Sequence, residues 1–117
     1  MSDVTESRVS VVIPVYNGGE KFLKCLEALS KCNPAPLEVI VIADGESDGT
    51  WRMAEKYGFR TFKFDTNNGP ALARNKGAEL ASGDILFFTD ADVVVQIDTI
   101  GKIVETYKKL YSAGSSS

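Results

Sequence analysis

Asp90 and Asp92 are two carboxylates one residue apart, and they are the side chains best placed to do chemistry in this sequence. They follow an apolar run, residues 85–89, which predicts a strand buried on both faces. The pair would then lie at the carboxyl edge of a parallel sheet, where open α/β folds bind ligands. Two such carboxylates repel each other unless a cation lies between them, and a hard divalent ion that also binds phosphate oxygens fits. The triplet alone is equally compatible with a solvated turn.

The elements that must position these carboxylates alternate between strand and helix four times. We expect strands at 9–13, 39–42, 59–64 and 85–89, and helices at 20–31, 51–57, 70–81 and from Asp98 onward. This alternation predicts a three-layer α/β/α, Rossmann-like fold with a mainly parallel sheet of order 3-2-1-4. We expect one domain over residues 8–111, preceded by a tail at 1–7 and followed by a flexible tail at 112–117.

Two other strand ends are predicted to open on the same edge as the Asp-x-Asp pair. The first strand, expected to stop at Pro14, leads to Tyr16, whose ring can stack on a base or merely cover the helix start. The second leads to Asp44, which can accept a hydrogen bond from a base N–H or cap the turn at Gly45. With an ion on Asp92 to neutralise a pyrophosphate, these residue types suit a nucleoside diphosphate.

The sequence lacks the loops that hold phosphates through backbone amides. The glycine fingerprint of dinucleotide sites is absent after the first strand, and so is a Gly-x-x-x-x-Gly-Lys loop. A metal and side chains would therefore have to hold the phosphates.

The composition excludes several classes of function. The 117 residues carry a net charge of -3 without a basic cluster, so a nucleic-acid partner is not expected. No apolar run approaches a membrane span, and the first residues do not resemble a signal peptide, so we expect a cytoplasmic protein. There is no histidine, which excludes histidine-based catalysis. Cys25 and Cys32 would lie about 10 Å apart along one helix, too far for a disulfide, and are expected to be reduced.

Four motifs in order and spacing resemble the family two glycosyltransferases of the GT-A fold over roughly residues 8 to 110. These motifs are Val11-Val12-Ile13-Pro14-Val15-Tyr16-Asn17, Ile42-Ala43-Asp44-Gly45-Glu46-Ser47-Asp48-Gly49-Thr50, Gly69-Pro70-Ala71-Leu72-Ala73-Arg74-Asn75-Lys76-Gly77, and Gly83-Asp84 with Thr89-Asp90-Ala91-Asp92. The resemblance implies a nucleotide pocket lined by Pro14, Val15, Tyr16 and Asp44. It places Arg74 near the nucleotide, Asp90 on the ribose side, and Asp92, with Asp90, at a Mg²⁺ or Mn²⁺ ion.

The sequence departs from the family pattern in two respects. Family members usually carry two carboxylates where this chain has Ala43-Asp44, and Asp44 matches the second, base-contacting one. The family's acceptor half and its catalytic carboxylate follow the Asp-x-Asp strand, whereas this sequence stops one helix later. We therefore expect the nucleotide-sugar-binding half of an inverting, metal-dependent glycosyltransferase, with no catalytic base in these residues. A sugar-phosphate nucleotidyltransferase and a non-catalytic nucleotide-binding module are the alternatives.

The bare edge of the fourth strand makes self-association a further expectation. Without the acceptor half, this edge or a shared hydrophobic face could pair with a second copy.

Overall fold

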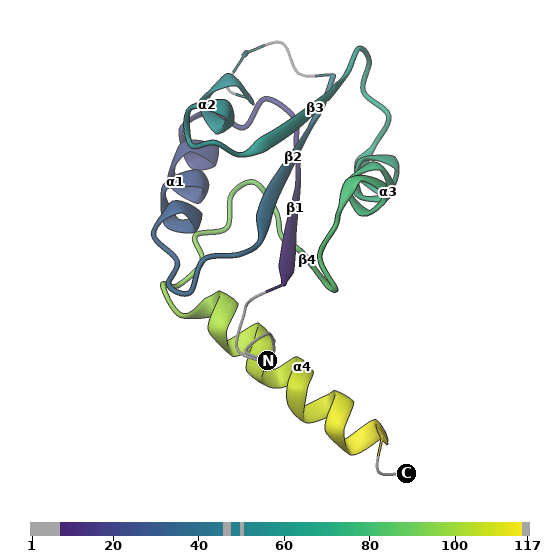
Figure 1. Cartoon of the computed structure of the whole chain (residues 1–117). Coiled ribbons are helices and arrows are strands. Elements are labelled where there is room, and N and C mark those ends of the chain that lie inside the picture. Colours follow the sequence, from purple (N-terminus) through teal and green to yellow (C-terminus); the bar gives the residue numbers. More distant parts are fainter. Residues whose placement is uncertain (1–7, 46–47, 50, 116–117) are drawn as a thin grey trace.

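A computed structural model describes residues 8–45, 48–49 and 51–115 of the chain (Figure 1). Glu46, Ser47 and Thr50 of the second motif, like the expected tail at 1–7, lie outside the described residues. The strands are β1 (Val9–Val15), β2 (Glu38–Asp44), β3 (Arg60–Phe64) and β4 (Ile85–Phe88). The helices are α1 (Gly19–Ser30), α2 (Trp51–Lys56), α3 (Pro70–Leu80) and α4 (Thr99–Ser115).

The strands form a parallel sheet of order β3-β2-β1-β4, which confirms the predicted topology. Helices α1 and α2 lie on one face of the sheet and α3 lies on the other (Figure 1). The reversal of strand order falls between β1 and β4. Ligands of open parallel sheets bind at such a point, beyond the carboxyl ends of the strands.

The two central strands are buried because helices cover both of their faces. On the α1 side, one apolar cluster joins alternate residues of β1 and β2 to the inner face of α1, whose buried residues are Phe22, Cys25, Leu26 and Leu29. On the α3 side, Ile40 and Ile42 of β2 pack with Ala73. Gly77 of α3 also lies directly against Val12, where a Cβ atom would overlap the valine side chain. The central sheet therefore forms a closely packed base for the strand ends.

Strand β1 does not stop at Pro14, as the sequence predicted, but runs on to Val15 beside β2. The carbonyl of Val12 faces β4 and accepts the Thr89 N–H at 3.1 Å. Pro14, two residues on, faces the same side, beyond the last pair of β1 and β4. Its missing N–H therefore costs no hydrogen bond of the sheet, and β1 carries Pro14 and Val15 to the carboxyl edge.

The expectation that the fourth strand is buried on both faces is wrong. Strand β4 lies at the edge of the sheet, and Leu86 and Phe88 on one of its faces are 40% and 41% exposed. Ile85 and Phe87, on the other face, pack against the main core cluster. Because α3 packs over β1 and β2, the outer face of β4 is left open.

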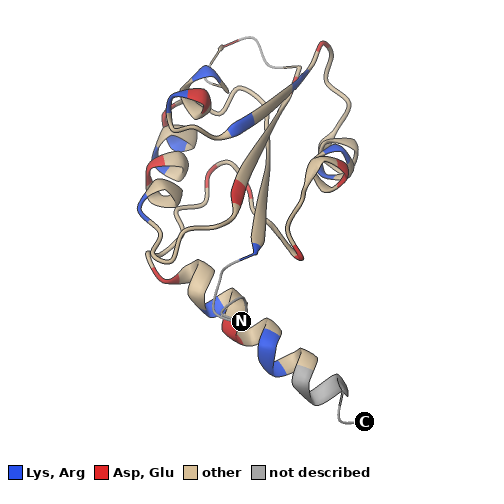
Figure 2. Ribbon diagram, in the orientation of Figure 1, with Lys and Arg blue, Asp and Glu red and all other residues tan. Residues whose placement is uncertain are grey.

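Helix α4 buries only its first turns. Ile100 is fully buried, whereas Tyr107 and Tyr111 are 41% and 68% exposed and stack on each other with ring centroids 6.0 Å apart. The helix continues past residue 111 to Ser115 and extends away from the sheet (Figure 1). Acidic and basic residues are interspersed over the ribbon (Figure 2). Among the described helices, none is both long and apolar enough to cross a membrane.

Candidate functional site

A hollow of about 240 Å³ lies at the carboxyl edge of the sheet, at the reversal of strand order. Its lining comes from β1, β2, α3 and the loops after β3 and β4: Pro14, Val15, Tyr16, Asp44, Asn67, Pro70, Arg74, Asp90 and Ala91. The fold thus brings together all six residues that the sequence and the family resemblance placed in a nucleotide pocket. They come from parts of the sequence up to 76 positions apart (90 − 14).

Asp44 ends β2 and is the buried carboxylate of this hollow, with 4% of its surface exposed. Its two side-chain oxygens accept the backbone N–H groups of Asn68 at 2.7 Å and Gly69 at 2.9 Å. In return, the Asn67 side-chain amide donates to the Asp44 carbonyl at 3.2 Å. Asp44 therefore fixes the turn that leads into α3, and each of its oxygens keeps a lone pair that can accept a further hydrogen bond.

Gly45 explains how Asp44 reaches this turn. Its φ of +75° lies in the left-handed region, where other residues are strained. A Cβ atom there would also overlap the backbone of Thr66 and Asn67. The close approach of the two backbones brings the Asp44 carboxylate within reach of Asn68 and Gly69.

Tyr16 lies just beyond β1 and lines the same hollow, yet 56% of its surface is exposed. A large aromatic ring that is half exposed beside a polar cavity is available for stacking. The next residue, Asn17, has a positive φ of 49°, and its side-chain oxygen accepts the Asp48 N–H at 3.1 Å. This hydrogen bond ties the loop after β1 to the loop after β2 beside the tyrosine.

Arg74 is the cation of the hollow. It projects from α3 and pairs with Asp90 at 3.9 Å, with 44% of the arginine side chain and 69% of the aspartate side chain exposed. An exposed ion pair of this length contributes little stability, about 0–1 kcal/mol. Arg74 can therefore leave Asp90 for an anion without a large cost to the fold.

Asp90 and Asp92 follow β4 in a short turn that is closed by the Val93 N–H, which donates to the Asp90 carbonyl at 3.2 Å. Both carboxylates are exposed, and Asp90 faces the hollow, whereas Asp92 is not part of its lining. Between them, Ala91 packs inward against the main core cluster. Asp90 and Asp92 therefore face outward, while Ala91 between them anchors the turn to the core.

Asp90 and Asp92 suit a divalent ion that takes its remaining ligands from a substrate. Within the described ranges there is no cluster of three or more His, Cys, Asp or Glu residues able to hold a metal by themselves. Two carboxylates are nevertheless the usual protein contribution to a Mg²⁺ site whose other ligands are phosphate oxygens and water. Their hard oxygen atoms suit Mg²⁺ and Mn²⁺.

Cys25 lies near the site, although the sequence predicted only a reduced cysteine at this position. It is fully buried on α1, and its thiol lies 3.8 Å from the Asp90 carbonyl. Burial, together with the negative charge of Asp92, raises the pKa of the Cys25 thiol to about 11. The thiol therefore stays protonated at neutral pH and can donate a hydrogen bond.

Asn67, Asn68 and Gly69 also belong to the site, although the sequence did not predict them as site residues. Their hydrogen bonds to Asp44 bridge 23 to 25 positions of sequence. A local pattern gives no signal for such a contact, although an Asn-Asn-Gly-Pro run after an edge strand marks a turn rich in N–H donors.

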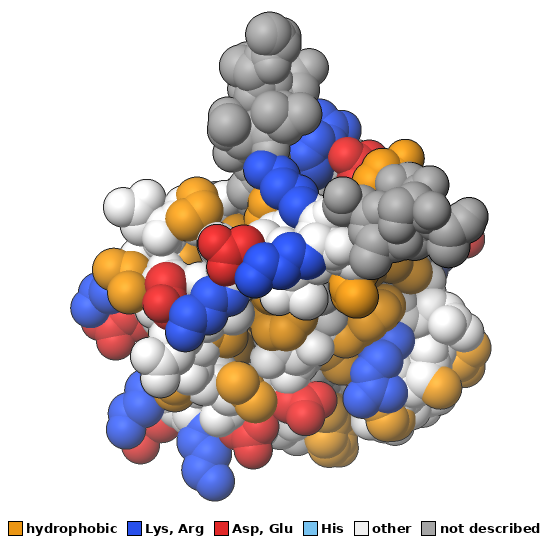
Figure 3. Space-filling view, turned by 90° about the horizontal axis from the view of Figure 1, so that it is seen from below, with side chains coloured by type: hydrophobic (Ala, Val, Ile, Leu, Met, Phe, Trp, Pro, Cys, Tyr) orange, Lys and Arg blue, Asp and Glu red, His pale blue; other side chains and the backbone are white. Residues whose placement is uncertain are grey.

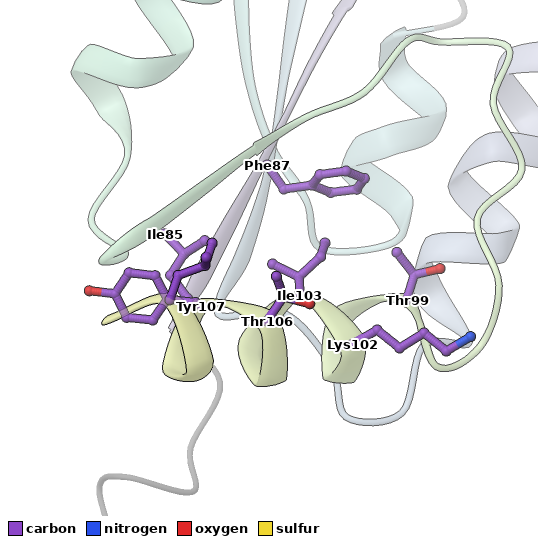
Figure 4. Close-up of a pocket in the computed structure, with 8 residues that line it drawn as sticks. Ile85, Phe87, Thr99, Lys102, Ile103, Thr106 and Tyr107 are labelled. Carbon is purple, nitrogen blue, oxygen red and sulfur yellow. The ribbon is translucent and has the colours of Figure 1, made fainter. Parts of the chain in front are cut away.

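A second, larger hollow of about 430 Å³ lies between β4 and α4 (Figure 4). Ile85, Phe87, Ile103 and Tyr107 point into it, and Lys102 lies at its side (Figure 4). Because Ile85 begins β4, this hollow is near the amino edge of the sheet, away from Asp44 and Asp90. Seen from below, the surface of the molecule shows hydrophobic side chains among charged ones (Figure 3). The lining is apolar apart from Thr99, Lys102 and Thr106, and it lacks a carboxylate.

Comparisons with known proteins agree with the fold. Residues 10–115 match the family model described as glycosyl transferase family 2. The chain is 38% identical over 90 residues to the uncharacterized glycosyltransferase YibD of Escherichia coli (strain K12), covering 74% of this chain and 26% of the relative.

Two solved structures are also similar. S. aureus TarS 1-349 in complex with UDP-GlcNAc has a TM-score of 0.80 and 27% identity over 87% of this chain and 31% of that chain. The mannosyltransferase PcManGT from Pyrobaculum calidifontis, in complex with GDP-Man and Mn²⁺, has a TM-score of 0.78 and 26% identity over 87% of this chain and 33% of that chain. The 117 residues thus span about a third or less of the length of these proteins.

Proposed function

The chain belongs to glycosyl transferase family 2, and we propose that it binds the nucleotide-activated sugar of an inverting, metal-dependent glycosyltransferase. The observation that carries this proposal is the hollow at the carboxyl edge, where an aromatic ring, a buried carboxylate, an arginine and the Asp-x-Asp turn meet. These groups match the base, the ribose and the diphosphate of one ligand. The similar structures with UDP-GlcNAc and with GDP-Man and Mn²⁺ support the same class of ligand.

In the proposed complex, Tyr16 stacks on the base beside Pro14 and Val15, and Asp44 accepts from a base N–H with a lone pair that its turn leaves free. Asp90 lies on the ribose side. Arg74 moves from Asp90 toward the diphosphate, since its ion pair there is weak. A guanidinium suits this role because it can donate two parallel hydrogen bonds to phosphate oxygens.

Asp92 and Asp90 would hold Mg²⁺ or Mn²⁺. When bound, such an ion would stabilise the negative charge of the departing diphosphate as a Lewis acid. The two carboxylates contribute fixed oxygen ligands from a turn that Ala91 anchors to the core. A turn held in this way lowers the cost of ordering the ligands.

We also propose that these 117 residues alone bind a nucleotide sugar without transferring the sugar. Inverting transfer needs a base within hydrogen-bond reach of the acceptor hydroxyl. Among the described residues after Asp92, the remaining carboxylates are Asp98, paired with Lys102 at 3.4 Å, and Glu105, exposed on α4. Neither one lines the hollow at the carboxyl edge.

Two further proposals concern the setting of the protein. The buried, free thiols of Cys25 and Cys32 support a cytoplasmic location, where thiols stay reduced. The outer edge of β4, with Leu86 and Phe88 exposed beside it, supports pairing with a second copy. A two-fold axis perpendicular to the sheet would pair the two β4 edges antiparallel and leave both α4 helices on the same face.

The proposed function is tested by titrating UDP and GDP into the chain with and without Mn²⁺, using isothermal titration calorimetry. We expect Mn²⁺ to strengthen binding in the parent chain and to have no effect in Asp92→Asn. The fold of this variant should be intact because Asp92 is exposed. Asp98→Asn is the matched control, since it removes an exposed carboxylate outside the hollow. Equal Mn²⁺ dependence in the parent and Asp92→Asn would refute the metal site.

A further inference from the structure

Helix α1 and the residues directly after it hold both ends of the loop that carries Asp90 and Asp92. At one end, the Cys25 thiol lies 3.8 Å from the Asp90 carbonyl. At the other end, the Cys32 thiol lies 3.6 Å from the Gln96 carbonyl, and the Asn33 N–H donates to the Ile97 carbonyl at 2.9 Å. The loop after β4 is thus fastened at two places to a segment that comes soon after β1 in the sequence, namely α1 and the residues that follow it.

The contact at Cys25 falls on the atom that closes the Asp-x-Asp turn. The Asp90 carbonyl accepts the Val93 N–H at 3.2 Å, and its second lone pair is available to the thiol. Cys25 is fully buried, so water does not compete for this contact. Ala91, inside the turn, packs on the same core cluster as Cys25.

We propose that Cys25 is a positioning residue: its thiol donates to the Asp90 carbonyl and thereby holds the Asp-x-Asp turn so that both carboxylates can bind one divalent ion. The consequence for metal binding rests on the proposed function, whereas the consequence for the turn does not. A thiol is a weak hydrogen-bond donor. It contacts the backbone carbonyl of Asp90 and not the carboxylate, so it acts on the carboxylates only through the backbone of the turn. The expected effect is therefore moderate and local.

The test compares Cys25→Ser, which keeps a donor, with Cys25→Ala, which removes it. If Cys25 only fills space, serine is the worse replacement because it buries a hydroxyl. If Cys25 positions the turn, alanine is the worse replacement. Cys32→Ala is the matched control, because it removes the other buried thiol of the same region from the far end of the loop. Cys25→Val, apolar and without a donor, replaces Cys25→Ala if the latter does not fold.

The first measurement is hydrogen exchange of the Val93 amide in the chain without metal or nucleotide, followed by NMR. We expect exchange to be roughly two- to fivefold faster in Cys25→Ala and close to the parent in Cys25→Ser and Cys32→Ala, from the net strength of a weak hydrogen bond. The second measurement is the affinity for Mn²⁺ in the presence of UDP, with the same order among the variants and the same range of change.

The two measurements separate the inference from the proposed function. A parent chain that binds UDP without any Mn²⁺ dependence refutes the metal site, and Val93 exchange then still decides the role of Cys25. Parent-like exchange in Cys25→Ala, or equal acceleration in Cys25→Ser and Cys25→Ala, would overturn the positioning role. Cys32→Ala accelerating Val93 as much as Cys25→Ala would also overturn it, since the effect would then be a general loosening of the loop.

Discussion

Replacing Asp44 by asparagine is expected to weaken the fold as well as the binding of nucleotide. The parent carboxylate accepts two backbone N–H groups, from Asn68 at 2.7 Å and Gly69 at 2.9 Å, at a position that is 4% exposed. The asparagine oxygen can keep one of these hydrogen bonds, but its NH₂ group must face the other N–H. One hydrogen bond to a charged group is lost, which corresponds to about 1.5–3 kcal/mol of unfolding free energy.

This loss can be measured by urea denaturation, with the fluorescence of Trp51, the one tryptophan of the chain, as the signal. For a domain of this size, a loss of about 2 kcal/mol would also lower the melting temperature by roughly 8 °C. Asp65→Asn is the matched control, because this exposed carboxylate lies between β3 and the Asn67–Gly69 turn. It should change the unfolding free energy by less than about 0.5 kcal/mol.

The binding consequence is measured on Asp44→Ala, which is expected to weaken UDP binding by roughly 1–3 kcal/mol, the cost of leaving a polar group without its hydrogen-bond partner. Equal unfolding free energies for Asp44→Asn and Asp65→Asn would refute the role of Asp44 in the turn. Unchanged UDP affinity in a folded Asp44→Ala variant would place the base contact on another residue.

Three further predictions address the aromatic ring, the acid stability and the sheet edge. Tyr16→Ala should cost about 1–3 kcal/mol of UDP binding if the ring stacks on the base, as measured by calorimetry, whereas Tyr57→Ala, an exposed ring away from the hollow, should not change it. For Glu38, burial alone would raise its pKa, but the hydrogen bonds from Ser10 and Ser82 and the charge of Arg60 together lower it below the ordinary 4.5. The Glu38 carboxylate therefore adds stability that is fully present above pH 4.5 and is lost as the pH falls through the lowered pKa. In Glu38→Gln, the unfolding free energy should depend less on pH in this range. The same pH dependence in the variant and the parent would contradict the network. The parent chain should form dimers or larger species in light scattering, and Leu86→Lys on the edge strand should be monomeric, while a monodisperse parent monomer would rule out edge pairing.

The fold could be predicted from sequence because its signals are local and repeat. The β-branched run 39–42 and the helical spacing of Phe22, Leu26 and Leu29 each specify one element. The alternation of elements, with right-handed crossovers, specifies the strand order. Pro14 was misread because a proline is compatible with a strand wherever its missing N–H faces no neighbour, and that depends on where β4 ends.

The residues of the site could be named, but their internal contacts could not. Tyr16, Asp44 and Asp90 stand out as chemical groups after strands, and the parallel topology alone predicts that they meet at one edge. The hydrogen bonds of Asp44 to Asn68 and Gly69, and the contact of Cys25 with Asp90, join residues from 24 to 65 positions apart. Such contacts depend on how closely two backbones approach, which hydrophobic periodicity does not encode.

The central position of β1 has a consequence for the order in which the molecule acquires its structure. This strand is the first to be made, yet it pairs with β4, whose residues are 76 positions further along the chain (Val9 with Ile85). Closing a loop of that length costs entropy before any contact offsets it, so pairings of this kind slow the search for the native state. Pro14 belongs to β1 and Asp90 follows β4, so the hollow that they line is complete only after these two strands have paired. A nucleotide added during refolding should therefore bind only in the last kinetic phase.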